Sequence, residues 1–278
     1  MLAREELVEQ AYFFKALSER TDAGIPIQEV LAGIQEELLA TTDLPKAIEF
    51  MASELQIYGG FGPAMERLSH YFTPFQIFVV TEAEDERGSF DLKTGLEILR
   101  RDAEYRGGDP SPQGVFLYQF ESICRNRLRY DPGLTATAED PFFTPPWRDW
   151  IRTVRRQVGL VEVADLIYVR SEHYRTQRPA DSGEPEVVLF GEKEGRIALA
   201  NRKKEPLLLF AALQRQLGYP EVPRPQPVAR DHEILDQMRR RMERFEQRMK
   251  LLEEEAKGGI KIERYFAAPD PPSERPLT

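Results

Sequence analysis

Short amphipathic segments separated by glycine and proline make up the first 107 residues, and they constrain the fold more than any other feature of the sequence. Their apolar residues recur at steps of three and four, which places them on one face of an α-helix. Breaks at residues 21–26, 43–45, 59–60 and 107–108 separate the segments. Because six such segments follow one another with short connections, the sequence predicts an antiparallel six-helix bundle over residues 1–107.

The breaks between these segments have local physical reasons. Gly24 before Pro26 lets the chain reverse between two helices, and Gly88 suits a left-handed turn position. Thr73 before Pro74 is typical of a helix start, because a threonine side chain accepts a free backbone N–H and proline has none to satisfy.

The order of these landmarks resembles the cytoplasmic domain of the GspF family, the platform proteins of type II secretion and type IV pilus assembly. Ala-Gly-x-Pro at residues 23–26, the glycine turn at 60–65, Phe-Thr-Pro-Phe at 72–75 and the turn at 83–91 carry the resemblance, which covers about residues 1–107. The signature positions in this sequence are Gly24, Pro26, Gly60, Pro74, Glu84 and Gly88. Ala83 stands where the family usually has glycine, and no transmembrane segment follows.

In that family this domain is a scaffold that contacts the assembly ATPase and neighbouring inner-membrane components. The resemblance therefore implies a non-enzymatic scaffold or adaptor that binds protein partners of this kind through its bundle. Residues 1–108 hold 20 acidic against 10 basic side chains, and such an acidic surface favours a basic protein face over a phosphate backbone. Solubility alone is the alternative explanation of this charge.

The middle of the chain, residues 111–219, predicts a small α+β module. β-favouring runs at residues 166–169, 187–190 and 196–200 predict a short antiparallel sheet, with residues 191–195 as a hairpin turn. Residues 131–146 are rich in Pro, Gly and Thr and predict a loop. The predicted fold class is therefore mainly α, with one small sheet.

The C-terminal part predicts a linker, a long helix and a tail. Prolines at positions 220, 223, 225 and 227 predict an extended linker over residues 220–228. Residues 229–257 predict a coiled-coil-like helix that forms homo-oligomers or packs back on its own domain, and residues 258–278 predict a largely disordered tail. The apolar seam of this helix consists of Leu235, Met238, Met242, Phe245, Met249, Leu252 and Ala256.

No local motif predicts chemistry. Cys124 is the single cysteine, and three histidines are too few for a usual zinc cage. No Ser-His-Asp or phosphate-loop pattern is present, so the sequence predicts no catalytic, cofactor-binding or metal-binding residues and no cofactor. The alternative is an enzyme or small-molecule-binding protein, whose site would form between the bundle and the α+β module.

Charge and hydropathy narrow the partners and the location. The net charge of −9 argues against nucleic-acid binding. The longest mostly apolar run, residues 207–213, is far shorter than the ~20 residues of a membrane-spanning helix. We expect a cytoplasmic protein that is not integral to the membrane, with peripheral attachment at the inner membrane left open.

Overall fold

The computed structural model describes residues 2–85, 90–177 and 187–224, all within one compact unit, Met1–Pro225. The seam helix and the tail fall in the second unit, Gln226–Thr278, and lie outside the described residues. Thirteen α-helices occur in the described part of the chain. They are α1 Arg4–Asp22, α2 Ile27–Glu37, α3 Leu44–Tyr58, α4 Phe61–Arg67, α5 Pro74–Glu84, α6 Leu92–Gly107, α7 Pro112–Arg125, α8 Tyr130–Glu139, α9 Pro145–Gln157, α10 Val163–Tyr168, α11 Glu172–Gln177, α12 Glu192–Ala200 and α13 Pro206–Leu217.

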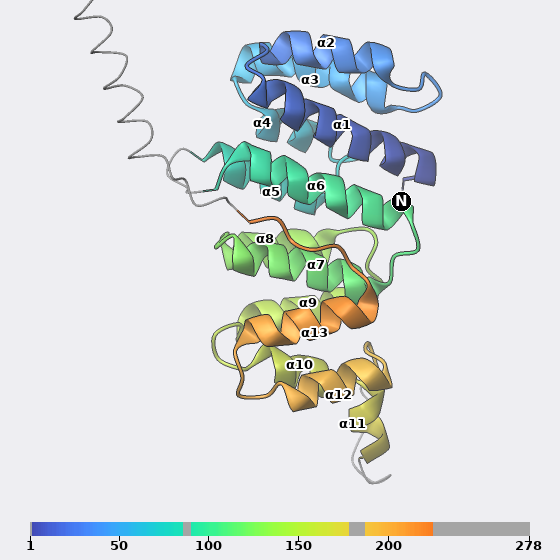
Figure 1. The fold of residues 1–278 in the computed structure, drawn as a ribbon, viewed down its shortest axis with the longest axis vertical. Helices are drawn as coiled ribbons and strands as arrows, with labels where there is room; N and C mark the ends of the chain where they lie inside the picture. Colours follow the sequence, from blue (N-terminus) through green and yellow to red (C-terminus); the bar gives the residue numbers. More distant parts are fainter. Residues whose placement is uncertain (1, 86–89, 178–186, 225–278) are drawn as a thin grey trace, which may run out of the picture. The chain divides into compact units, whose positions relative to one another are not determined.

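The six helices expected in residues 1–107 are present as α1 to α6. Each packs on the next in chain order, and α6 returns to lie along α1, so the six close into a ring (Figure 1). The helix start expected at Thr73 and Pro74 is confirmed. The Thr73 side chain accepts from the Gln76 backbone N–H, and the Gln76 side chain accepts from the Thr73 backbone N–H.

The helices after residue 107 continue directly from this ring. Helix α7 packs on α6, α8 packs on α5 and α7, and α9 packs on α8 (Figure 1). Helix α13 returns to α7, while α10, α11 and α12 pack together beyond it. Over the described residues, no helix combines the length and the apolar character needed to cross a membrane.

The predicted antiparallel sheet is wrong, because the described residues contain no β-strand. Residues 166–168 belong to α10, residues 196–200 belong to α12, and the 187–190 run makes only an isolated bridge from Phe190 to Ser171. Ala164, Leu166, Ile167 and Tyr168 of α10 are all buried. A short helix buried on most sides has a continuous apolar run, which periodicity cannot distinguish from a strand.

The predicted hairpin turn at residues 191–195 is also wrong, since α12 begins there. Glu192 and Glu194 lie in its first turn, where acidic side chains stabilise a helix. Gly195 does not form a turn but allows α12 to pack closely against Ser171, because a Cβ at this position would lie 2.2 Å from Ser171 Oγ.

Helix α8 replaces most of the loop predicted for residues 131–146. Pro132 lies in its first turn, where a backbone N–H has no partner within the helix. Gly133 lets α8 approach its neighbours closely, because a Cβ there would lie 2.8 Å from Ile123 Cδ1 and 2.9 Å from Phe78 Cζ. Proline and glycine both indicated a loop in the sequence, yet at these two positions both are compatible with a helix.

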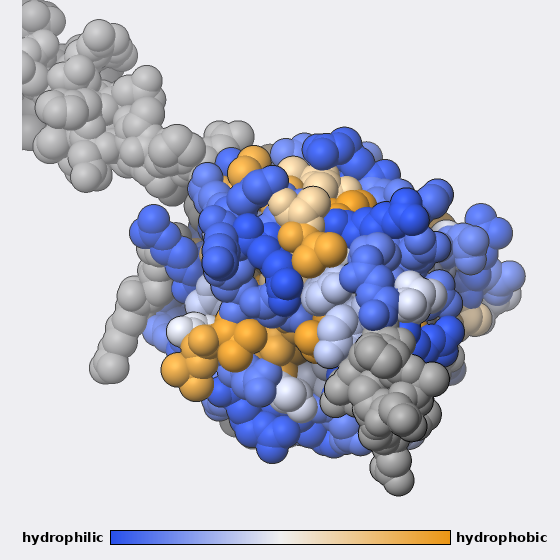
Figure 2. All heavy atoms as spheres, turned by 90° about the horizontal axis from the view of Figure 1, so that it is seen from below, coloured by the Kyte–Doolittle hydropathy of each residue, from blue (hydrophilic) through white to orange (hydrophobic). Residues whose placement is uncertain are grey.

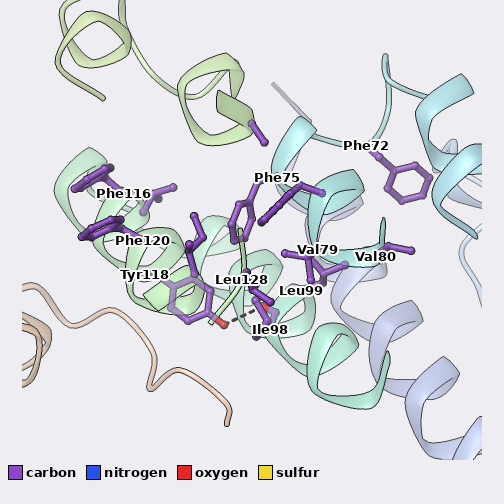
Figure 3. Packing of buried hydrophobic residues seen from close by; sticks show 14 of the residues in the cluster. Phe72, Phe75, Val79, Val80, Ile98, Leu99, Phe116, Tyr118, Phe120 and Leu128 are labelled. Atoms are coloured by element: carbon purple, nitrogen blue, oxygen red, sulfur yellow. Dashed lines mark hydrogen bonds between the residues drawn. The ribbon is translucent and has the colours of Figure 1, made fainter. Parts of the chain in front are cut away.

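A single hydrophobic core runs from α1 to the end of the described chain. Figure 3 shows the part where Val79 of α5, Leu99 of α6 and Phe120 of α7 belong to one cluster. At its centre the Tyr118 hydroxyl donates to the Ile98 carbonyl oxygen over 2.9 Å, and Tyr118 is fully buried (Figure 3). The core therefore crosses residues 107–111, where the sequence predicts a domain boundary.

A buried charge cluster joins the same two parts. Arg106 Nη2 and Nη1 donate to the two carboxylate oxygens of Asp140, over 2.5 and 3.2 Å. Arg106 Nε lies 2.7 Å from Asp102 Oδ2, one turn earlier on α6. Gln119 of α7 also donates to Asp140, and Asp102, Gln119 and Asp140 have no exposed surface.

Two carboxylates share one guanidinium in this cluster, so one of them binds a proton more readily than usual. Burial raises the pKa of the Asp102 carboxyl from its ordinary value to about 6, and Asp140 adds to the rise while Arg106 opposes it. Between about pH 4 and 6, the Asp102 carboxyl is therefore protonated in the folded chain and has released its proton in the unfolded chain. The contribution of Asp102 to the free energy of unfolding consequently falls as the pH rises through this window.

We predict that Asp102→Asn removes this pH-dependent loss of stability. The free energy of unfolding of the variant, measured relative to the wild type by urea denaturation, should rise by about 3 kcal/mol between pH 4 and pH 7. The control Asp149→Asn changes an exposed carboxylate on α9 and should shift stability by less than about 0.5 kcal/mol at either pH. A difference between Asp102→Asn and wild type that does not change with pH would contradict the raised pKa of Asp102 in the folded chain.

Candidate functional site

An apolar groove lies where the connection from α9 to α10 meets the start of α13. It has a volume of about 390 Å³. Phe120 and Phe210 form its buried floor, and Pro206, Leu207 and Val161 line its sides. Four separate parts of the chain build it, namely α7, the start of α8, residues 158–163 and residues 205–210. We call it the α13 groove.

Leu207 lines the α13 groove and remains in contact with solvent, as do its sequence neighbour Leu208 and Leu160, which lies between the lining residues Gly159 and Val161. Leu160 is 84% exposed, Leu208 is 53% exposed and Leu207 is 40% exposed. The view from the α11 and α12 end shows hydrophobic residues gathered in more than one group among hydrophilic ones (Figure 2). A gathered apolar patch is typical of an interaction surface, whereas single exposed apolar residues are common on any protein.

The charged side chains that line the α13 groove are both acidic. They are Glu162, just before α10, and Glu205, just before α13. Glu162 is held in place, because its Oε2 accepts from the Lys203 backbone N–H over 2.8 Å. The groove therefore combines an apolar floor with a fixed negative charge on its rim, the arrangement found at protein interfaces with a polar rim.

Cys124 and Tyr130 close one side of the α13 groove. Burial raises the pKa of the Cys124 thiol to about 11, and burial likewise raises the pKa of the Tyr130 hydroxyl. A thiol with such a pKa is protonated near neutral pH, and the protonated form is a poor nucleophile. Cys124 therefore fits a small packing residue.

Two signature residues of the resemblance, Gly60 and Glu84, lie together at the start of α4. Glu84 stabilises the start of α4, because its Oε1 and Oε2 accept from the backbone N–H groups of Phe61 and Gly62 over 2.5 and 2.8 Å. Gly60 is close to the same carboxylate, so the structure brings Gly60 and Glu84 together. A carboxylate at a helix N-terminus stabilises the helix through its free N–H groups.

The other signature residues lie apart from this pair. Gly24 has a φ of 77° and Pro26 precedes α2, so both shape the turn between α1 and α2. Pro74 is the first residue of α5. Gly88 and the seam residues from Leu235 to Ala256 lie outside the described residues, so their roles stay predictions.

Sequence reasoning did not find the α13 groove. Its lining comes from segments about 40 residues apart, and the start of α13 alone has the pattern of an ordinary buried helix. Leu160 gave the clearest signal in the sequence. It follows Gly159 in the connection between α9 and α10, where a leucine has few neighbours to cover it, and it is exposed. Searching the described ranges finds no group of three His, Cys, Asp or Glu side chains placed to hold a metal ion.

Comparison of this chain with family models, with curated proteins and with solved structures finds no match. The resemblance of residues 1–107 to the GspF family therefore stays a prediction from the sequence.

We predict that the single cysteine reacts slowly in the folded chain. Alkylation of Cys124 by iodoacetamide at pH 8 should be about a hundredfold slower than in the urea-unfolded chain, because the thiolate fraction is lower by that factor. Mass spectrometry gives both rates from one sample, since the sequence holds no other thiol. Equal rates in the two states would show an activated or fully open thiol instead.

Proposed function

We propose that the chain is a non-enzymatic scaffold that binds a protein partner in the α13 groove. The observation that carries the proposal is a groove with an aromatic floor whose lining residues Leu207 and Val161 stay 40% and 38% exposed. Leu208 and Leu160, their neighbours in the sequence, are more exposed still. Leaving large apolar side chains in water forgoes about 1.5 to 3 kcal/mol for each one that a partner could bury. Aromatic residues at the centre of such a surface are the usual source of binding energy.

The occupant that suits this groove is an amphipathic helix with lysine or arginine beside its apolar stripe. Apolar grooves between helices bind such helices through residues spaced three and four apart. Glu162 and Glu205 would face the basic flanks of the partner and favour them over acidic ones. Such pairing also makes binding weaker at high salt.

The resemblance to the platform family adds partner classes to this proposal. An assembly ATPase or an inner-membrane assembly component is the partner that the family would imply, and a second copy of the chain is the partner that the seam helix would imply. These identities rest on the sequence alone. The groove argues only for the chemistry of the bound segment.

Docking through the acidic N-terminal bundle is the competing arrangement. A second groove of about 400 Å³ lies on α1 and α6, where Val8 is 54% exposed. Its charged lining residues are Arg4, Lys15 and Glu104, which are mixed in sign. The α13 groove is favoured because it exposes more apolar side chains and has a rim of one sign.

We predict selective binding of a defined helical peptide. A fluorescent amphipathic helix with a leucine stripe and lysine flanks should bind the full chain at least about tenfold more tightly than the same peptide with glutamate flanks. Leu207→Asp should weaken that binding at least about tenfold, because it places a charge in the apolar surface. Fluorescence anisotropy measures both effects.

The matched control is Val8→Asp, which makes the same change in the groove on α1 and α6. It should leave the affinity for the lysine-flanked peptide unchanged. Loss of binding in Val8→Asp but not in Leu207→Asp would place the docking surface on the bundle and contradict the proposal. Equal affinity for both peptides would contradict the role of the acidic rim.

A further inference from the structure

A separate polar cavity of about 220 Å³ lies between the N-terminal ring of helices and the turn from α8 to α9. Helices α1, α5 and α6 form three of its walls, and residues 69–73 and 140–142 form the others. Ser69 and His70 are exposed and mark its opening. The cavity lies between residues of the first 107 and residues that follow them, where the sequence alternative places a small-molecule site.

Two buried glutamines line this cavity, and the amide donor of one of them is incompletely satisfied. Gln76 Nε2 donates to Gln10 Oε1 over 2.9 Å, and Gln76 Oε1 accepts from the Thr73 backbone N–H. Gln10 and Gln76 are almost fully buried. Gln10 Nε2 interacts with the Tyr71 hydroxyl, yet it completes no hydrogen bond of normal geometry within the described structure. Buried amide groups normally find a partner, so this one requires an explanation.

The charged groups of the cavity wall are already matched. Arg106 pairs with Asp140 through both Nη atoms and also lies beside Asp102. Its guanidinium lies over the Phe142 ring at 5.5 Å from the ring centre. No unpaired positive charge is therefore available at this wall to compensate an anionic ligand, and burying an uncompensated charge is strongly unfavourable.

The rest of the lining is apolar and partly aromatic. Leu2, Leu7, Phe72, Pro74 and Phe142 surround the polar groups. Pockets that bind small molecules combine such a lining with a few polar groups that orient the ligand. Aromatic side chains pack well on flat rings.

We propose that this cavity binds a small uncharged heteroaromatic ring that carries a carbonyl group, as in a carboxamide or a lactam. The ligand carbonyl oxygen accepts from Gln10 Nε2, and the ring packs against Phe142, Leu2 and Leu7. The proposal is independent of the α13 groove, because the two sites share no lining residue.

Nicotinamide and uracil are suitable probes, since one carries a carboxamide and the other a lactam. Nicotinate is the charged control, because it differs from nicotinamide only in having a carboxylate in place of the amide. Titration calorimetry with the full chain should show nicotinamide or uracil binding at micromolar to millimolar concentration, and nicotinate binding at least about tenfold more weakly than nicotinamide.

Two variants test the assigned site. Gln10→Leu removes the incompletely satisfied donor and should weaken binding of the probes about tenfold, whereas Gln28→Leu, an exposed glutamine on α2, should leave it unchanged. Ser69→Trp fills the opening from an exposed position, so it tests the site without disturbing the core. It should abolish binding, and the control Ser53→Trp on the surface of α3 should not.

Three results would overturn the proposal. The first is that neither nicotinamide nor uracil binds, which would mean that the cavity holds water only. The second is that nicotinate binds as tightly as nicotinamide, which would exclude the uncharged class. The third is that Ser69→Trp, with unchanged thermal stability, binds the probes like the wild type, which would place their site elsewhere.

Discussion

Arg106 imposes the constraint on which the two parts of the described chain depend. Its side chain is buried at the end of α6, where an unpaired charge would be strongly unfavourable. Asp102 on the same helix supplies one carboxylate, and Asp140 from the turn after α8 supplies the second. Since removing one partner of a buried ion pair costs about 3 to 5 kcal/mol, α6 and the turn from α8 to α9 must stay together.

This pairing also determines the chemistry of the polar cavity. Because Arg106 is neutralised within the wall of the polar cavity, that cavity presents an amide donor and apolar side chains instead of a free charge. The α13 groove is different, because its floor comes from the core and its acidic side chains lie at the rim. Both hollows rest on one continuous core, so the bundle and the later helices form a common support for them.

The helices of residues 1–107 could be predicted from the sequence because their apolar faces are regular and their starts carry local signals such as Thr73-Pro74. The sheet prediction failed where burial on most sides produced continuous apolar runs, as at Leu166 to Tyr168. Asp102 and Arg106, one helical turn apart on a buried face, were a readable signal of a charge cluster. Asp140 and Gln10 were not readable, because their neighbours are distant in the sequence.

The most direct test of a single joined unit is native-state hydrogen exchange followed across α3 and α9. Buried amides at Met51 and Leu55 belong to the ring, and those at Ile151 and Val154 belong to the later helices. We predict that the most protected amides in both helices open with the same free energy and the same denaturant dependence, because both require global unfolding. Opening of α9 at a clearly lower free energy, while α3 stays protected, would contradict a unit held together by the core and by Arg106.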